Sequence, residues 1–215
     1  MMIKKRIIAA TAALLAAFSL TCGCENPKES EVEENNYESN EKFDEMFKDV
    51  PDSEEGPLLT IKDTTAKAGE VAEVTISVEN AEGKWNFCGL HIIYPEELDC
   101  VNISDDKPDA EYTPGDACSR LNLNTAMEWQ GKRPEELEDR EVGAAFYTAV
   151  STENNGKDGD IVTLYLKIPD DAESGDEYPV DFYFYNTDHF KGVENDLAFE
   201  KYAFSHWKGG TITVE

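Results

Sequence analysis

The residue types that most often perform catalysis are present, but they are not arranged as an active site. The three histidines, His91, His189 and His206, share no spacing, and the sequence lacks G-x-S-x-G, H-E-x-x-H and glycine-rich phosphate-binding motifs. Asp and Glu total 46, so a carboxylate pair at the glycosidase separation of about 5 to 9 Å would occur by chance. The net charge of −27 excludes nucleic acid as a partner, because phosphate backbones are bound through Lys and Arg. We therefore predict a protein that is not an enzyme.

The segment NNGKDGDIVTLY, which starts at Asn154, begins like a calcium-binding EF-hand loop. Asp158 and Gly159 stand at the fifth and sixth positions of that pattern. The third position is Gly156 and the twelfth is Tyr165, so the bidentate carboxylate that completes such a site is missing. The segment is predicted to be a turn that leads into a strand, and no metal or cofactor is predicted for this chain.

Three of the five cysteines, Cys88, Cys100 and Cys118, lie in the strand-rich part of the sequence. Their odd number leaves at least one thiol unpaired. Cys88 and Cys100 share their strand phase with Leu90 and Leu98, which places both side chains inward. A buried free thiol and a disulfide are both consistent with this pattern.

The N-terminal residues have the pattern of an export signal. A basic segment, MMIKKR, precedes IIAATAALLAAFSL, an apolar stretch shorter than the roughly 20 residues of a membrane span. The following TCGC resembles a bacterial lipobox in which Gly23 precedes a lipidated Cys24, with Cys22 or an ordinary signal as the alternatives. Several acyl chains on one cysteine would hold the protein at a membrane. We predict a signal over residues 1–24, lipidation at Cys24, and an exported protein anchored at the outer face of the bacterial cell membrane.

Residues 25–57 are predicted to form an acidic, flexible linker, because they are rich in Glu, Asn, Ser and Asp and offer few side chains to bury. Within this linker, Phe43, Met46, Phe47 and Val50 have the spacing of an amphipathic helix. Such a helix could bind a partner. It could also be a short helix that docks on its own domain or frays in water.

From residue 58 onward, apolar and polar residues alternate with the period of two that is typical of β-strands. Turn-forming stretches such as KAGE, NAEGK and DDAESGDE separate many of these segments, and no helical crossover is evident. We predict an all-β domain over residues 58–215, a β-sandwich of about nine strands with jelly-roll topology. The strand segments are LLTIKD, VAEVTISVEN, NFCGLHIIYP, LDCVNIS, RLNLNTAM, VGAAFYTAVS, IVTLYLKIP, YPVDFYFYN and GGTITVE.

The stretch LTIKDTTAKAGEVAEVTISVEN resembles the opening of a cohesin domain. Cohesins share an Ala-Lys-x-Gly-x-x-Val turn, which is matched here by Ala66, Lys67, Gly69 and, approximately, Val71 or Val74. FCGLHIIYPEELD resembles their third strand, GDIVTLYLKIPDDAESGDEYPV their seventh and eighth strands, and GGTITVE their closing strand. The resemblance therefore runs in order through the whole strand-rich region.

Two features depart from the cohesin pattern. The turn aspartate between Tyr94 and Pro95 is missing, and residues 104–118 and 186–208 are long for the family. Cohesins are the modules by which cellulosomal scaffold proteins capture dockerin-bearing enzymes. The resemblance implies a non-catalytic cell-surface protein whose partner is a dockerin, with calcium bound by the dockerin and not by this chain.

The resemblance also implies that the dockerin binds a flat sheet that includes the third, fifth, sixth and eighth strands. In the third strand Leu90, Ile92 and Tyr94 share the core face of Cys88, so the alternate residues should point outward. Phe and Gly replace the polar contact pair of the best-known cohesin class, which implies a more apolar interface. The predicted dockerin-binding residues are Phe87, Gly89, His91, Tyr147, Ala149, Tyr183 and Tyr185. Alternatively, the tyrosines pack beneath residues 186–208.

A carbohydrate-binding lipoprotein is the second function to consider, because cohesins resemble some carbohydrate-binding modules in fold. Exposed Trp85, Trp129 and Trp207 could stack on the sugar rings of a polysaccharide. Aromatic side chains in a row on one flat face would favour this alternative. Aromatic side chains scattered between core and loops would favour dockerin binding.

Overall fold

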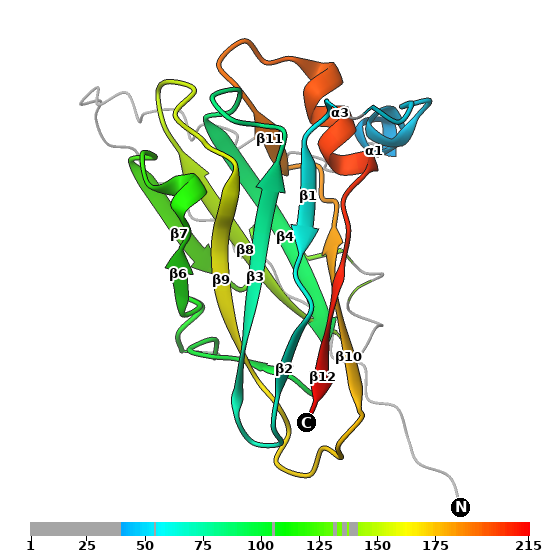
Figure 1. Ribbon diagram of the computed structural model, residues 1–215, viewed down its shortest axis with the longest axis vertical. Coiled ribbons are helices and arrows are strands. Elements are labelled where there is room, and N and C mark those ends of the chain that lie inside the picture. The colour runs from blue at the N-terminus through cyan, green and yellow to red at the C-terminus, as the bar shows by residue number, and fades with distance from the viewer. Residues whose placement is uncertain (1–39, 54, 105, 131–132, 135–136, 138–141) are drawn as a thin grey trace, which may run out of the picture. The chain divides into compact units, whose positions relative to one another are not determined.

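The chain folds into two β-sheets that pack against each other (Figure 1). This computed structural model describes residues 40–215 with the exception of 54, 105, 131–132, 135–136 and 138–141. The described residues belong to one compact unit. The predicted signal, Cys24 and the first part of the predicted linker lie outside the described residues.

One sheet has five strands and the other has seven. The order in the first sheet is β1-β3-β9-β5, with β6 also paired to β9, and the order in the second is β2-β12-β10-β4-β8-β7, with β11 also paired to β4. The five-stranded sheet contains β1 (Leu58–Ile61), β3 (Val71–Glu79), β5 (Asp99–Cys100), β6 (Tyr112–Pro114) and β9 (Gly159–Lys167). The seven-stranded sheet contains β2 (Thr64–Ala66), β4 (Phe87–Pro95), β7 (Leu123–Met127), β8 (Val142–Val150), β10 (Glu177–Tyr183), β11 (His189–Lys191) and β12 (Gly210–Val214).

All nine segments predicted from alternation contain a strand, and the predicted all-β sandwich is confirmed. The three short strands β2, β6 and β11 carried no alternation signal, since each has only three residues. β11 lies inside the long 186–208 segment and is followed there by helix α3 (Leu197–Ser205). Asp196 caps that helix, because its carboxylate accepts hydrogen bonds from the backbone N–H groups of Ala198 and Phe199.

The core lies between the two sheets, where alternate side chains of each strand meet. Its largest fully buried side chain is Trp85, which packs on Phe190 with ring centroids 5.1 Å apart. Gly156 lies directly against the Trp85 indole, so that a Cβ at this position would clash. This close packing explains the glycine at the third position of the EF-hand-like segment. Asp158 in the same segment accepts hydrogen bonds from the backbone N–H groups of Asn80 and Ala81, as expected for a turn.

Helix α1 (Asn40–Phe47) lies within the stretch predicted to be a flexible linker, and it packs on α3. Met46 is buried, and Phe47 packs partly buried against the core. Of the two alternatives for this amphipathic segment, the structure has the helix docked on its own domain. The apolar spacing that predicted the helix thus also explains its docking.

Candidate functional site

The seven-stranded sheet has an outer face that points away from the core, and its residues follow from the strand register. On β4 the side chains of Cys88, Leu90 and Ile92 lie in the core, so Phe87 and His91 belong to the outer face. Residues directly opposite each other on paired strands share a face. The outer positions are therefore Phe87, Gly89, His91 and Ile93 on β4, Val142, Ala144, Phe146, Thr148 and Val150 on β8, Leu123, Thr125 and Met127 on β7, and His189 and Lys191 on β11.

Two of the predicted binding residues belong to the core and not to this face. Tyr147 is paired with Leu90 and Ala149 with Cys88, and all four side chains are buried in the main core. The prediction that Tyr147 and Ala149 face outward is therefore wrong. The reason is that β8 has apolar residues in both of its phases, and only the register with β4 decides which phase is inside.

His91 and Gly89 point toward the outer face as predicted, but they are covered. The His91 imidazole is enclosed by the rings of Trp129, Phe146 and Tyr185, with centroids at 4.0, 4.6 and 5.4 Å. A Cβ at Gly89 would approach the Phe146 ring at 3.3 Å. The prediction that these two residues are available at the surface is therefore not met.

His91 forms a buried pair with Asp188, which lies 97 residues later in the chain. The Nδ1–Oδ1 distance is 2.5 Å, and both side chains are almost wholly excluded from solvent. The backbone N–H of Gln130 donates to Nε2 of His91, so Nε2 carries no proton and Nδ1 is the nitrogen that donates to Asp188. Burial raises the pKa of Asp188, although hydrogen bonds from His91 and from the Tyr185 N–H oppose that rise.

Tyr183 and Tyr185 also contribute to this covered half of the face. Trp129 packs on both rings, with centroid distances of 6.0 Å to Tyr183 and 5.4 Å to Tyr185. The Tyr185 side chain is buried and that of Tyr183 is half-buried. The two tyrosines are thus covered by Trp129, which lies outside residues 186–208.

The other half of the face, toward the start of β4, is open. Leu123 is 61% exposed, and Phe87, Val150, Thr148 and Thr125 are half-buried. Phe87 lies between His189, at a ring distance of 5.3 Å, and Lys191, whose Nζ is 5.8 Å from the ring centroid. We call the surface formed by Leu123, Thr125, Thr148, Val150, Phe87, His189 and Lys191 the open half-face.

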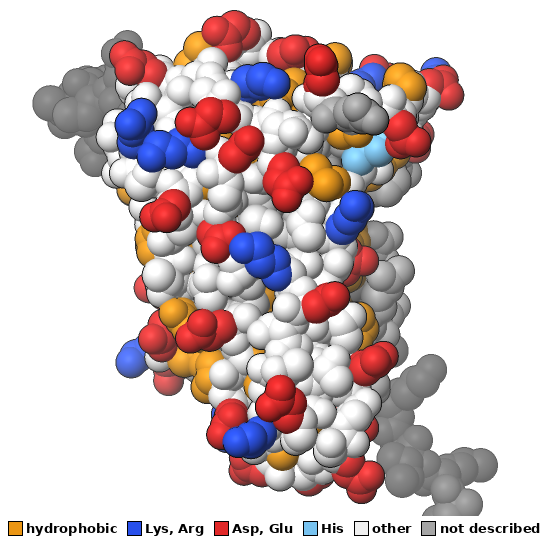
Figure 2. Space-filling view, in the orientation of Figure 1, with side chains coloured by type: hydrophobic (Ala, Val, Ile, Leu, Met, Phe, Trp, Pro, Cys, Tyr) orange, Lys and Arg blue, Asp and Glu red, His pale blue; other side chains and the backbone are white. Residues whose placement is uncertain are grey.

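The open half-face carries no negative charge. No outward position along β4, β7, β8 and β11, strands that the structure describes completely, is Asp or Glu. The outer face of the five-stranded sheet differs, because acidic and basic side chains are scattered over it (Figure 2). For a chain of net charge −27, an apolar surface without carboxylates is a local exception that needs a function. Sequence reasoning did not predict Leu123 as a binding residue. The one signal for it is that Leu123 is apolar although it alternates with the buried Ala126 along β7 and should therefore point outward.

The tryptophans do not form a platform for a sugar chain. Trp85 is fully buried, so the prediction of its exposure is wrong. Trp129 covers His91, and Trp207 stacks on Phe182 with centroids 5.2 Å apart. The aromatic side chains are therefore scattered between core and loops, which is the arrangement expected for dockerin binding.

The three cysteines of the sandwich are free and buried, which decides between the thiol and disulfide alternatives. Burial raises the pKa of Cys88 and raises that of Cys100 to about 11. No cluster of three or more His, Cys, Asp or Glu side chains suited to a metal ion occurs among the described residues. In the same part of the chain, no helix has the length and apolar character needed to cross a membrane.

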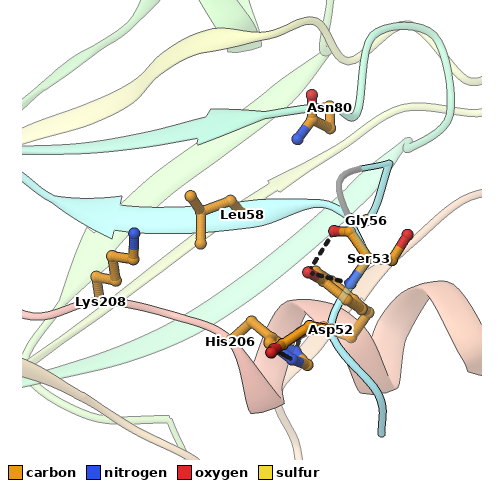
Figure 3. Close-up of a pocket in the computed structure, with 8 residues that line it drawn as sticks. Asp52, Ser53, Gly56, Leu58, Asn80, His206 and Lys208 are labelled. Carbon is orange, nitrogen blue, oxygen red and sulfur yellow. Dashed lines mark hydrogen bonds and ion pairs between the residues drawn. The ribbon is translucent and has the colours of Figure 1, made fainter.

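A pocket lies beside α3, where the chain enters β1 (Figure 3). Its lining includes Asp52, Ser53, Tyr202 and His206. These residues hydrogen-bond to one another, Asp52 to His206 and Ser53 to Tyr202. The pocket thus lies at the contact between α3 and the residues that lead into β1.

Comparison with known proteins agrees with this geometry. No protein-family model and no curated protein matches the sequence. Among solved structures, a type III cohesin module from the cellulosomal ScaE cell-surface anchoring scaffoldin of Ruminococcus flavefaciens is 30% identical, with a TM-score of 0.63 and coverage of 78% of this chain and 92% of that chain.

Two further structures support the same fold at lower identity. The type I cohesin in the Coh-OlpA-Doc918 cohesin–dockerin complex from Clostridium thermocellum is 15% identical, with a TM-score of 0.54 and coverage of 74% of this chain and 99% of that one. The sixth cohesin of Acetivibrio cellulolyticus scaffoldin B, solved in complex with a Cel5 dockerin mutant, is 17% identical, with a TM-score of 0.51 and the same coverages. Taken with the sandwich topology and the identity to the Ruminococcus flavefaciens module, these matches show that the chain belongs to the cohesin family.

Proposed function

We propose that this protein is a non-catalytic anchoring protein whose cohesin domain binds a dockerin module and so recruits a polysaccharide-degrading enzyme or a scaffoldin. The observation that carries the proposal is the open half-face, an apolar surface without carboxylates on a strongly acidic protein. Two similar cohesins were solved in complex with dockerins, which supports a dockerin as the partner.

The binding residues that we propose on this surface are Phe87 and Leu123, with Val150 between them. Phe87 and Leu123 are each paired with Val150 across neighbouring strands, so the three side chains form one row. Such a row suits the apolar ridge of a helix. Of the residues predicted from sequence, Phe87 remains in the proposed interface, and Tyr183, Tyr185, His91 and Gly89 support the sheet from its covered half.

We further propose that lipidation at Cys24 holds the domain at the outer face of the cell membrane. The lipobox-like TCGC supports this anchor. The similar Ruminococcus flavefaciens module comes from a cell-surface anchoring scaffoldin, which is consistent with the same placement.

The direct test uses every dockerin module encoded in the genome that encodes this chain, expressed singly and titrated against the protein in calcium and then in a chelator. One or more dockerins should bind in calcium only. Binding to polysaccharide with no binding to any dockerin would favour the carbohydrate alternative and contradict the proposal.

Phe87→Ala tests the position of the interface. Truncating an aromatic anchor of this row should cost at least about 2 kcal/mol of binding, which is about thirty-fold in affinity, while stability should fall less than for a core phenylalanine because Phe87 is only half-buried. Leu90→Ala on the core side of β4 is the matched control, and it should lose about 2 to 5 kcal/mol of stability. Unchanged dockerin affinity of Phe87→Ala would remove this residue from the interface.

A further inference from the structure

Helix α1 is held against the domain by apolar and polar contacts. Met46 is 3% exposed, and the Phe47 ring meets the rings of Phe184 and Trp207 edge-on at 5.5 and 5.8 Å. The Ser205 hydroxyl, at the end of α3, donates a hydrogen bond of 2.8 Å to the backbone carbonyl of Met46. Glu45 forms an ion pair with Lys201 of α3. The last turn of α1 is thus attached to α3 and to two neighbouring aromatic side chains.

The segment that follows α1 contacts Tyr202 of α3. The Tyr202 hydroxyl donates to the backbone carbonyl of Ser53 at 2.6 Å and accepts from the backbone N–H of the same residue at 3.1 Å. His206 stacks on the Tyr202 ring at 3.9 Å and binds Asp52 at 2.9 Å. Gly56 lies so close to the ring that a Cβ there would clash with it. The described residues from Glu45 to Gly56 therefore contact α3 from outside the sandwich.

The opposite side of α3 reaches the open half-face through Glu200. This buried carboxylate accepts a hydrogen bond of 2.8 Å from Nδ1 of His189 and one of 3.2 Å from the backbone N–H of Phe190. Phe199 of α3 also stacks on Phe190, with centroids 5.6 Å apart. His189 in turn packs beside Phe87.

A buried carboxylate must keep its hydrogen-bond donors, because losing them leaves a desolvated charge without compensation. The position of Glu200 on α3 therefore determines the positions of His189 and of the β11 backbone, which bond to its carboxylate. The imidazole of His189 and the ammonium group of Lys191 then both lie against the Phe87 ring. The position of Phe87 is thereby linked to the docking of α1, although no residue of α1 lies on the sheet.

We propose that Glu200 is a positioning residue of the binding surface and that residues 40–56 act as a brace for it, so that the N-terminal segment is part of the binding module. The positioning of Phe87 stands on contacts within this chain. Its consequence for dockerin affinity rests on the proposed function.

The experiment measures amide hydrogen exchange by NMR on the full chain in detergent, with no partner present. The Phe190 amide is the reporter, because its hydrogen bond ends on Glu200. Met46→Ala with Phe47→Ala should accelerate its exchange on the order of tenfold, and Glu200→Ala should do so at least as strongly. Glu200→Gln keeps an acceptor oxygen, and it should restore most of the protection. Val71→Ala, an exposed apolar residue of β3, is the matched control and should have no effect.

Two results would overturn the proposal. One is an unchanged Phe190 exchange rate in the Met46→Ala, Phe47→Ala variant. The other is an equal acceleration throughout β3 and β9, because the N-terminal segment would then support global stability only.

Dockerin affinity gives the second readout. Both the α1 variant and Glu200→Ala should weaken binding several-fold, and combining them should add little, since they act on one contact chain. Fully additive losses would contradict the proposed connection. If no dockerin binds the parent protein, the proposed function fails, whereas the exchange rate of Phe190 still decides whether the brace exists.

Discussion

His91→Ala should destabilise the protein strongly, because it breaks a polar pair that has no access to water. The substitution removes the imidazole that bonds to Asp188 at 2.5 Å, whereas the longer hydrogen bonds from the backbone N–H groups of Tyr185 and of residue 91, at 3.0 and 3.4 Å, remain. It also removes the acceptor of the Gln130 N–H and the ring against which Trp129 packs. Removing one partner of such a buried pair costs about 3 to 5 kcal/mol. Urea unfolding at neutral pH should show this loss, and Thr125→Ala on the open half-face should show almost none.

The pH dependence of this loss has a definite sign. Burial already raises the pKa of Asp188, and without His91 the pKa should rise further. Below the ordinary Asp pKa the carboxyl is protonated in both folded and unfolded chains, so the penalty should be small there. The penalty should grow as pH rises through the folded pKa and should be largest at neutral pH. His91→Ala with Asp188→Ala should lose less stability than the sum of the single variants. A loss below about 1 kcal/mol for His91→Ala at neutral pH would refute the assignment of a tightly coupled buried pair.

Three further predictions concern the surface, the anchor and the thiols. Leu123→Asp places a carboxylate on the open half-face, so dockerin affinity should fall at least about tenfold while the melting temperature stays nearly constant, given the 61% exposure of this side chain. Cys24→Ala should release the protein from the membrane fraction into the medium, and retention of that variant with Cys22 intact would place the anchor elsewhere. Cys100, whose pKa burial raises to about 11, should resist thiol reagents at pH 8 until denaturant is added; labelling of this residue in the native protein would contradict its burial.

Alternation in the sequence was sufficient to predict the strands, because side chains of a half-buried strand must alternate between core and surface. It could not predict which phase of β8 is buried. Ala145, Tyr147 and Ala149 occupy one phase, and Ala144 and Phe146 occupy the other, so both look apolar. The pairing of Tyr147 with Leu90 resolves the ambiguity, and this pairing is a long-range contact that local patterns do not encode.

The burial of one half of the outer face could not be predicted from the sequence, because it too depends on long-range contacts. On β4, His91 alternates correctly with Leu90 and therefore looks like a surface residue. Its burial depends on Asp188 and on Trp129, which approach it from segments far away in the chain. The apolar spacing around Met46 predicted a helix, but the docking site on α3 exists only because residues 186–208 form that helix.

The long 186–208 segment, which departs from the cohesin pattern, reshapes the binding sheet in three ways. β10 leaves β4 after Tyr183, and β11 returns to pair with β4 from His189, so that the start of β4 has a different neighbour from its end. The turn between these strands supplies Asp188, which hydrogen-bonds to His91 on the covered half of the face. The helix that follows supplies Glu200, which holds His189 beside Phe87 on the half that stays open. Because this segment holds His91 on the covered half and His189 on the open half, a change in it should alter the surface that a partner helix meets, and the specificity proposed for this cohesin should therefore depend on residues 186–208 as well as on the strands.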